Sequence, residues 1–154
     1  MGGVTKAVTP PRRLLGLPTW LIGHLANRSH DVVLTAFGDA ECRSEYAVLA
    51  CVDEFGPLSQ TELSRRIRMD TGDLVRLLRR LEDRNLLSRR LDGRDRRRNL
   101  VTITRAGGAE LRRLDAVIER AQQRLLEPLD GAQRATLLEC LQRLFDHHLD
   151  GTAS

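Results

Sequence analysis

The stretch "SQTELSRRIRMDTGDLVRLLRRLEDRN", residues 59–85, decides the fold. Its opening "SQTE" has the Ser-x-x-Glu form of a capping box, which predicts that a short helix begins after Ser59 with Leu63 and Ile67 facing inward. A second capping signal, "DTGD" from Asp70, predicts a helix whose leucines recur at i, i+3, i+4 and i+7. These leucines are Leu74, Leu77, Leu78 and Leu81. Two short helices joined by about three residues are typical of a helix-turn-helix.

The second of these helices has an outer face suited to DNA. At about 100° per residue, Gly72, Arg76 and Arg79 point away from the leucine stripe, with Asp73, Val75 and Arg80 on the flanks. This is the face that a major groove would meet. The residues that we expect to contact DNA from the two helices are Gln60, Thr71, Gly72, Asp73, Arg76 and Arg79.

After this helix the pattern changes to that of strands. Asn85 stands where a left-handed residue is wanted, a conformation that asparagine tolerates. "LLSRRL" and "NLVTIT" (86–91 and 99–104) carry alternating and β-branched residues, and Asp92-Gly93 between them signals a turn. The tip, residues 88–99, holds six arginines and two aspartates in twelve residues. We therefore expect an arginine-rich β-hairpin that contacts a negatively charged partner; a solvated hairpin without a ligand is the plainer alternative.

Helices are predicted on both sides of this unit. One runs from Pro18 to about Gly38, and another from near Ser44 to Phe55. Thr104 can cap a long helix that ends by Pro128, and its apolar residues step by three and four: Leu111, Leu114, Ile118, Ala121 and Leu125. "DGAQ" restarts a final helix, which ends near Leu149. Its inward residues are expected to be Leu137, Leu138, Leu141, Leu144 and Phe145.

Charge and cysteine content narrow the class of protein. The 154 residues suit one domain, and 25 basic against 21 acidic residues favour an anionic partner. Lys6 is the only lysine, so the positive charge is nearly all guanidinium, which reads phosphates and guanine edges; a GC-rich genome would produce the same bias. Three cysteines without a CxxC spacing argue against a disulfide framework and a thiolate zinc site, and favour a reducing cytoplasm. No signal peptide or membrane-spanning run of apolar residues is present in the sequence.

Taken together, residues 18–149 resemble the multiple-antibiotic-resistance regulator (MarR) family of bacterial transcription factors. The resemblance is carried by "GPLSQTELSRRIRMDTGDLVRLLRRLEDRNLLSRRLDGRDRRRNLVTITRAG", residues 56–107. Within it, "RLEDRNLLSRR" looks like the end of the family's recognition helix running into the wing. "DGRDRRRNLVTITRAG" looks like the family's wing signature, in which Asp-x-Arg precedes a strand that ends in Ile-Thr and a nearby glycine.

The resemblance implies a mainly α fold with a small β-hairpin wing, a winged helix-turn-helix that is an obligate homodimer through its N- and C-terminal helices. The implied function is a sequence-specific regulator of transcription, a repressor on a near-palindromic operator in double-stranded DNA. The implied division is a flexible arm (1–17), a dimerisation region (18–43 and 105–149), a DNA-binding lobe (44–104) and a tail (150–154).

Some positions of this sequence match functional positions of the family, and others differ from them. Arg97 matches the wing arginine that reaches the minor groove, with Arg94, Arg96 and Arg98 beside it as further DNA contacts. Asp95 matches the acid that braces the wing, and Arg76 matches the arginine on the exposed face of the recognition helix. Gly72 and Asp73 replace a common Ser-Thr pair, so the base preference of relatives does not transfer.

A small-molecule effector is the next expectation, since members of the family bind phenolic or aromatic acids between the dimerisation helices and the DNA-binding lobe. Trp20, His24, Arg28 and Tyr46 could line such a cleft, offering stacking and a cation for a carboxylate. Ordinary packing of Trp20 and Tyr46 and a surface role for Arg28 are the alternative.

Other classes of function have less support. Metal sensing would draw on His24, His30, Glu41 and Cys42, or on His147 and His148, but neither group has a recognised ligand spacing. Oxidant sensing needs an exposed cysteine of low pKa, whereas Cys42, Cys51 and Cys140 are expected to be buried. No nucleophile motif or glycine-rich loop indicates an enzyme, and no cofactor is expected. A winged-helix module that binds protein rather than DNA remains the rival interpretation.

Overall fold

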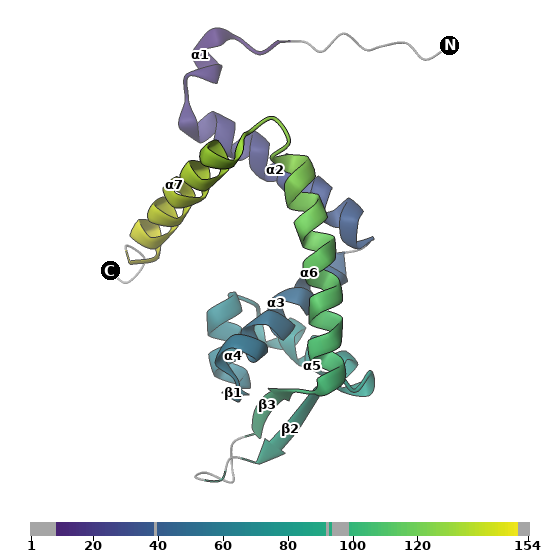
Figure 1. Cartoon of the computed structure of the whole chain (residues 1–154). Helices are drawn as coiled ribbons and strands as arrows, with labels where there is room; N and C mark the ends of the chain where they lie inside the picture. The colour runs from purple at the N-terminus through teal and green to yellow at the C-terminus, as the bar shows by residue number, and fades with distance from the viewer. Residues whose placement is uncertain (1–8, 39, 92, 94–98, 151–154) are drawn as a thin grey trace.

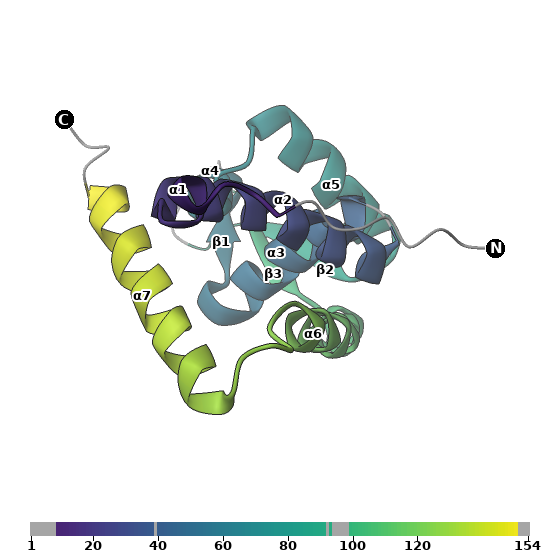
Figure 2. The ribbon, with the colours of Figure 1, turned by 90° about the horizontal axis from the view of Figure 1, so that it is seen from above.

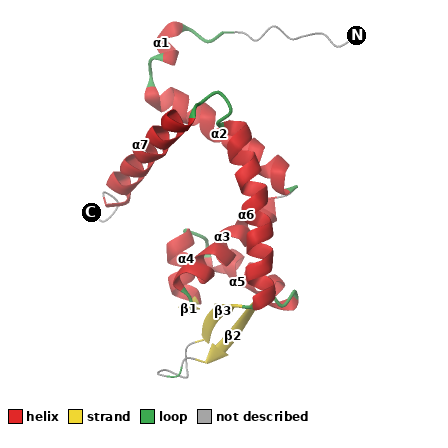
Figure 3. Cartoon of the chain, in the orientation of Figure 1, coloured by secondary structure: helices red, strands yellow, loops and turns green. Residues whose placement is uncertain are grey.

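The computed structural model describes residues 9–38, 40–91, 93 and 99–150. In chain order its elements are α1 (Arg12–Leu15), α2 (Pro18–Phe37), α3 (Ala40–Phe55), β1 (Leu58–Ser59), α4 (Gln60–Ile67), α5 (Thr71–Asp83), β2 (Leu87–Leu91), β3 (Asn99–Ile103), α6 (Arg105–Leu125) and α7 (Gly131–Asp150). Helices make up most of the chain, and the strands gather at one end of it (Figure 3). The expected fold class, mainly helical with a small β wing, is confirmed.

The helix-turn-helix forms as the capping signals predict. The Ser59 hydroxyl accepts from the Glu62 backbone N–H at 3.3 Å, and the Glu62 carboxylate accepts from the Ser59 N–H at 2.9 Å, so the capping box of α4 is complete. The four leucines of α5 are buried against Val48, Leu49 and Val52 of α3 and Leu63 of α4. Full burial of each such side chain contributes about 1.5–3 kcal/mol, which anchors α5 by its inner face.

The β-sheet has one strand more than the sequence indicated. β2 and β3 pair antiparallel as the predicted hairpin, with Leu87 opposite Ile103 and Leu91 opposite Asn99. The two-residue β1 pairs with the other edge of β3, giving the order β1-β3-β2. This strand was missed because two residues are too few to show an alternating pattern. It ties the start of α4 to the wing.

A tight junction joins the wing to the long helix α6. Asn85 has a φ of +56°, the left-handed conformation expected at this position. The Thr104 hydroxyl accepts from the Gly107 N–H at 3.0 Å and donates to the Asn85 carbonyl at 2.6 Å, so it caps α6 and fastens it to the end of α5. A Cβ on Gly107 would lie 2.0 Å from the Leu86 carbonyl oxygen, so only glycine fits here.

The long helix α6 extends from the sheet to the opposite end of the molecule (Figure 1). α2 packs along α6, and α3 contacts both of them. The predicted second helix begins at Ala40 rather than near Ser44, one turn earlier. Residues 12–15, expected to belong to a flexible arm, form the short helix α1, which contacts α2. No helix in the described part of the chain is long and apolar enough to cross a membrane.

The final helix α7 forms as predicted, but its apolar face is not covered as predicted. It begins with the predicted capping box, in which Asp130 and Gln133 exchange hydrogen bonds of 2.9 and 3.0 Å. Its apolar side chains were predicted to face inward, but they are exposed in the single chain because α7 lies at the edge of the molecule, apart from α3 to α6 (Figure 2). These residues are Leu137, Leu138, Leu141, Leu144 and Phe145.

Candidate nucleic-acid interface

The start of α5 is held by a strong cap. One oxygen of Asp70 accepts from the Gly72 N–H at 2.7 Å and lies 3.4 Å from the Asp73 N–H. A side-chain cap of this kind contributes about 1 kcal/mol and keeps the first turn of the helix formed. Thr71, Gly72 and Asp73 therefore stand on an ordered first turn, and all three are exposed.

The outer face of α5 carries two exposed arginines. The side chain of Arg76 is 78% exposed and forms an ion pair with Asp73, one turn earlier on the same helix. Arg79 is exposed one turn further on, while Gln60, at the start of α4, is half-buried. This face of the recognition helix thus carries two guanidinium groups and a carboxylate, which together can read both donors and acceptors on base edges.

A buried carboxylate fixes the flank of α5, and the sequence analysis missed it. Glu45 of α3 is 2% exposed, and its two oxygens accept from different arginines: Oε1 from Arg80 of α5 at 2.5 Å, and Oε2 from Arg84, the C-cap residue of α5, at 2.7 Å. Arg84 also lies 3.6 Å from Glu110 of α6. A signal was present in the sequence, since Glu45 shares a helix face with Val48, Leu49 and Val52, where a lone carboxylate requires a partner.

The wing lies beside the recognition helix (Figure 1). Arg89 of β2 forms a 2.7 Å ion pair with Glu82 of α5, with both side chains mostly buried, so the hairpin is braced against the helix. Across the strands, the hydroxyls of Ser88 and Thr102 are 2.8 Å apart. The predicted wing contacts lie outside the described residues, and they are Arg94, Asp95, Arg96, Arg97 and Arg98.

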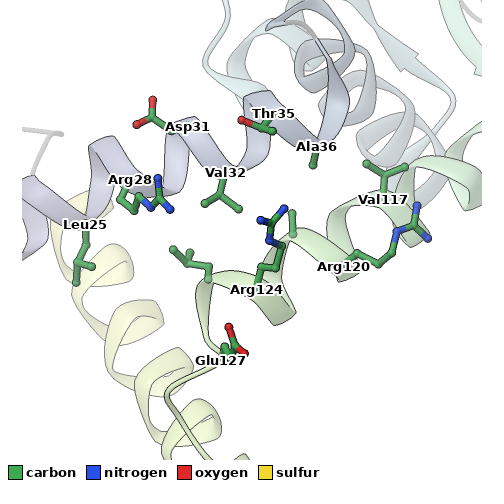
Figure 4. Close-up of a pocket in the computed structure, with 12 residues that line it drawn as sticks. Leu25, Arg28, Asp31, Val32, Thr35, Ala36, Val117, Arg120, Arg124 and Glu127 are labelled. Atoms are coloured by element: carbon green, nitrogen blue, oxygen red, sulfur yellow. The ribbon is translucent and has the colours of Figure 1, made fainter. Parts of the chain in front are cut away.

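A cavity of about 730 Å³ lies between α2 and α6, at the end of the molecule away from the sheet. Its walls combine apolar side chains such as Val32 and Leu125 with three arginines: Arg28, Arg120 and Arg124. Figure 4 shows Arg28 and Asp31 coming from α2, and Arg124 reaching from α6 toward α2. An apolar space bordered by guanidinium groups suits a small carboxylic acid.

The four predicted ligand-binding residues do not gather around this cavity. Arg28 lines it, whereas Trp20 and His24 stack on one another along α2 with ring centroids 4.0 Å apart. Tyr46 packs against Phe37 at 6.2 Å between centroids and donates to Asp115. Burial and the Asp115 carboxylate raise the pKa of the Tyr46 phenol above its usual 10.0.

The cysteines differ from one another in environment. Cys51 is buried as expected, and burial raises the pKa of its thiol above 9.0, which disfavours the reactive thiolate. Cys42 is half-buried. Cys140 is exposed rather than buried, because it lies on α7, at the edge of the molecule (Figure 2). Among the described residues, no three His, Cys, Asp or Glu side chains come together as a candidate metal site.

Comparison with known proteins agrees with this architecture. The MarR family model matches residues 43–98, which include α4, α5 and β2, the first strand of the wing. The HTH-type transcriptional regulator YxaD of Bacillus subtilis is 34% identical over 110 residues, 70% of this chain and 76% of that protein. The HTH-type transcriptional repressor NicR of Pseudomonas putida is 27% identical over 133 residues, 81% of this chain and 82% of NicR. A Thauera aromatica protein assigned to regulation of the hcr operon is 30% identical over 100 residues, which are 65% of this chain and 60% of that protein.

Solved structures extend the similarity to nearly the whole chain. The PcaV transcriptional regulator of Streptomyces coelicolor, in complex with its natural ligand, is 27% identical, with 92% of this chain and 98% of PcaV covered and a TM-score of 0.69. The repressor CouR bound to a 23-mer DNA duplex shares the fold at 24% identity, with 90% and 99% covered and a TM-score of 0.76. The family match covers the helix-turn-helix and the first strand of the wing, and the chain belongs to the MarR family of DNA-binding transcriptional regulators.

Proposed function

We propose that the protein is a homodimeric transcriptional repressor that binds a near-palindromic operator in double-stranded DNA and is released by a small aromatic acid. The observation that carries the proposal is the recognition helix α5. Its inner face is anchored by four buried leucines, its start is capped by Asp70, and its outer face presents Arg76 and Arg79. In this proposal the major groove meets Gln60, Thr71, Gly72, Asp73, Arg76 and Arg79, and the minor groove meets the wing arginines.

The wing part of the proposal rests on the sequence and on the bracing of the hairpin. Arg97 is assigned to the minor groove, Arg94, Arg96 and Arg98 to nearby phosphates, and Asp95 to holding the wing arginine in place. Because each arginine that neutralises a phosphate releases about one counterion, affinity should fall steeply as salt rises. The proposal includes a cytoplasmic location, where a bacterial regulator meets its DNA.

Uncovered apolar side chains support the homodimer. On α7, Leu138 and Phe145 are 57% and 58% exposed, and Leu25 of α2 is 58% exposed. Large apolar side chains exposed in this number on one end of a molecule are typical of an interface. We assign residues 18–43 and 105–149 to dimerisation and 44–104 to DNA binding. A twofold dimer would present two recognition helices to half-sites about one helical turn apart.

The cavity between α2 and α6 supports the effector. Its arginines can pair with a carboxylate, and its apolar wall can hold a ring. NicR is named a repressor, and PcaV was solved with its natural ligand, so the relatives of this chain include a repressor and a ligand-binding regulator. Of the four residues predicted from the sequence, Arg28 lines the cavity, and Trp20 and His24 lie on the same helix.

The test begins with a randomised duplex library, in which the protein should enrich a near-palindrome of about 20 base pairs. Fluorescence anisotropy then compares the enriched duplex with a shuffled one at several salt concentrations. We expect tighter binding to the enriched duplex and a steep loss of affinity with salt. Equal binding to both duplexes would contradict the proposal and favour the rival interpretation, a winged-helix module for a protein partner.

The effector is tested on the same complex. We expect 4-hydroxybenzoate or 6-hydroxynicotinate to release the enriched duplex from the protein, and Arg28→Ala or Arg124→Ala to weaken that release without weakening DNA binding. Release that survives both substitutions would place the effector elsewhere. The oligomer is tested by sedimentation, where Leu138→Glu together with Phe145→Glu should yield monomers if the α7 face is the interface.

A further inference from the structure

We propose that Glu45 is a positioning residue for DNA recognition: it holds the recognition helix α5 in one rotation and ties it, through Arg84 and Glu110, to α6. The inference rests on the proposed function, since it assigns a part of the protein that sets operator preference without touching DNA. Glu45 lies on α3, which contributes no residue to the proposed DNA interface.

The geometry of the contact defines one orientation of α5. Arg80 and Arg84 are one helical turn apart, and each gives a guanidinium N–H to a different oxygen of the same carboxylate, at 2.5 and 2.7 Å. Residues on a helix are separated by about 100°, so a rotation of α5 by one residue would remove both arginines from Glu45. Arg76 and Arg79 would turn away with them, because Arg76, Arg79 and Arg80 are on α5 and Arg84 is its C-cap residue.

Burial makes this contact more than a surface ion pair. Glu45 is 2% exposed, whereas the side chains of Arg80 and Arg84 are 41% and 45% exposed. A buried carboxylate without a partner is strongly disfavoured, so the native state must keep at least one arginine on it.

The helix α6 connects the Glu45 contact with the cavity. Arg84 lies 3.6 Å from Glu110, near the start of α6. The later turns of α6 carry Arg120 and Arg124, which line the cavity. α6 is continuous from Arg105 to Leu125 (Figure 1), so a shift of this helix at the cavity would move Glu110 relative to the Glu45 contact. Effector release of DNA would then pass through Glu45.

Two substitutions weaken the contact: Glu45→Gln, which keeps the size of the buried side chain, and Arg84→Gln, which shortens the exposed side chain and leaves Arg80 on the carboxylate. The matched control is Glu119→Gln, which removes the same charge from an exposed carboxylate that accepts a hydrogen bond from Gln123 on its own helix. The probes are the duplex enriched from the randomised library and its shuffled version, with affinity measured by anisotropy against salt. Circular dichroism confirms that each variant is folded at the temperature used.

We expect Glu45→Gln and Arg84→Gln each to weaken binding to the enriched duplex by about tenfold, with the shuffled duplex affected no more than by Glu119→Gln. The double variant should be no weaker than Glu45→Gln alone, because the two residues act through one contact. The salt dependence should stay that of the parent. If Glu45→Gln does not fold, Arg84→Gln decides the question.

Four outcomes would overturn the inference. Unchanged affinity with a lowered melting temperature would make Glu45 purely structural. A gain in affinity for both duplexes, with a salt slope steeper by about one counterion, would mean that Glu45 only keeps arginines from phosphates. A parent protein without sequence preference would refute the proposed function, and this inference with it; a parent that prefers its duplex and variants that equal it would refute this inference alone.

Discussion

Gly107→Ala should destabilise the protein at the junction between the wing and α6. The added Cβ would lie 2.0 Å from the carbonyl oxygen of Leu86 and 2.8 Å from Cγ1 of Ile103. Carbon and oxygen atoms in contact stand more than 3 Å apart, so the start of α6 or the start of β2 must move by about 1 Å. The obstacle is backbone that cannot rotate away. Overpacking of this kind costs about 1–3 kcal/mol, which lowers the melting temperature of a chain of this size by about 2–10 °C.

The neighbouring residue supplies the control. A Cβ on Gly108 would meet only the end of the Arg112 side chain, at 3.6 Å, which is an ordinary contact. Since alanine is favoured over glycine inside a helix by about 1 kcal/mol, Gly108→Ala should stabilise the protein. Urea denaturation at one fixed protein concentration measures both, because the stability of an oligomer depends on concentration. Equal effects of the two substitutions, or a neutral Gly107→Ala, would refute the packing described for this junction.

Three further predictions concern titratable groups. Tyr46 is the only tyrosine, so the near-ultraviolet absorbance of tyrosinate reports its ionisation alone. The pKa of Tyr46 should lie above 10.0 and should fall toward that value in Asp115→Asn. The stability that the raised pKa contributes should be lost as pH rises through that pKa. With Cys42 and Cys140 replaced by serine, Cys51 should react with a thiol reagent only as the protein unfolds, and rapid reaction in the native state would contradict its burial. The hydrogen bond from Arg113 lowers the pKa of Glu110 below 4.5. Arg113→Gln should therefore reduce stability at neutral pH, and this effect should disappear as pH falls through the lowered pKa. An equal loss of stability at every pH would contradict the Arg113–Glu110 pair.

Local signals made the helix-turn-helix predictable. The capping boxes at Ser59 and Asp130, the cap at Asp70 and the left-handed Asn85 all depend on residues within a few positions of one another. The leucine stripe of α5 needs only the helical period to be seen, and its burial confirms which face is inner. The resemblance to the MarR family rests on the same local stretch and is confirmed.

Features that depend on contacts between distant parts of the chain could not be predicted from local sequence patterns. The Glu45 contact joins residues 35 and 39 positions apart, and nothing in the local pattern names Arg80 and Arg84 as its partners. The cavity is made by two helices far apart in sequence, and it includes one of the four residues proposed for it. The inward face predicted for α7 needs a surface to pack on, which a single chain does not supply.

The central claim is that the outer face of α5 reads DNA sequence, and Arg76→Ala tests it most directly. The control is Arg143→Ala, an exposed arginine on the side of α7 opposite its apolar residues, so that both variants lose one positive charge. Anisotropy should show that Arg76→Ala loses about tenfold or more in affinity for the enriched duplex and much of its preference over the shuffled one. Arg143→Ala should behave as the parent. Equal affinities for the two variants, with preference intact, would contradict the account.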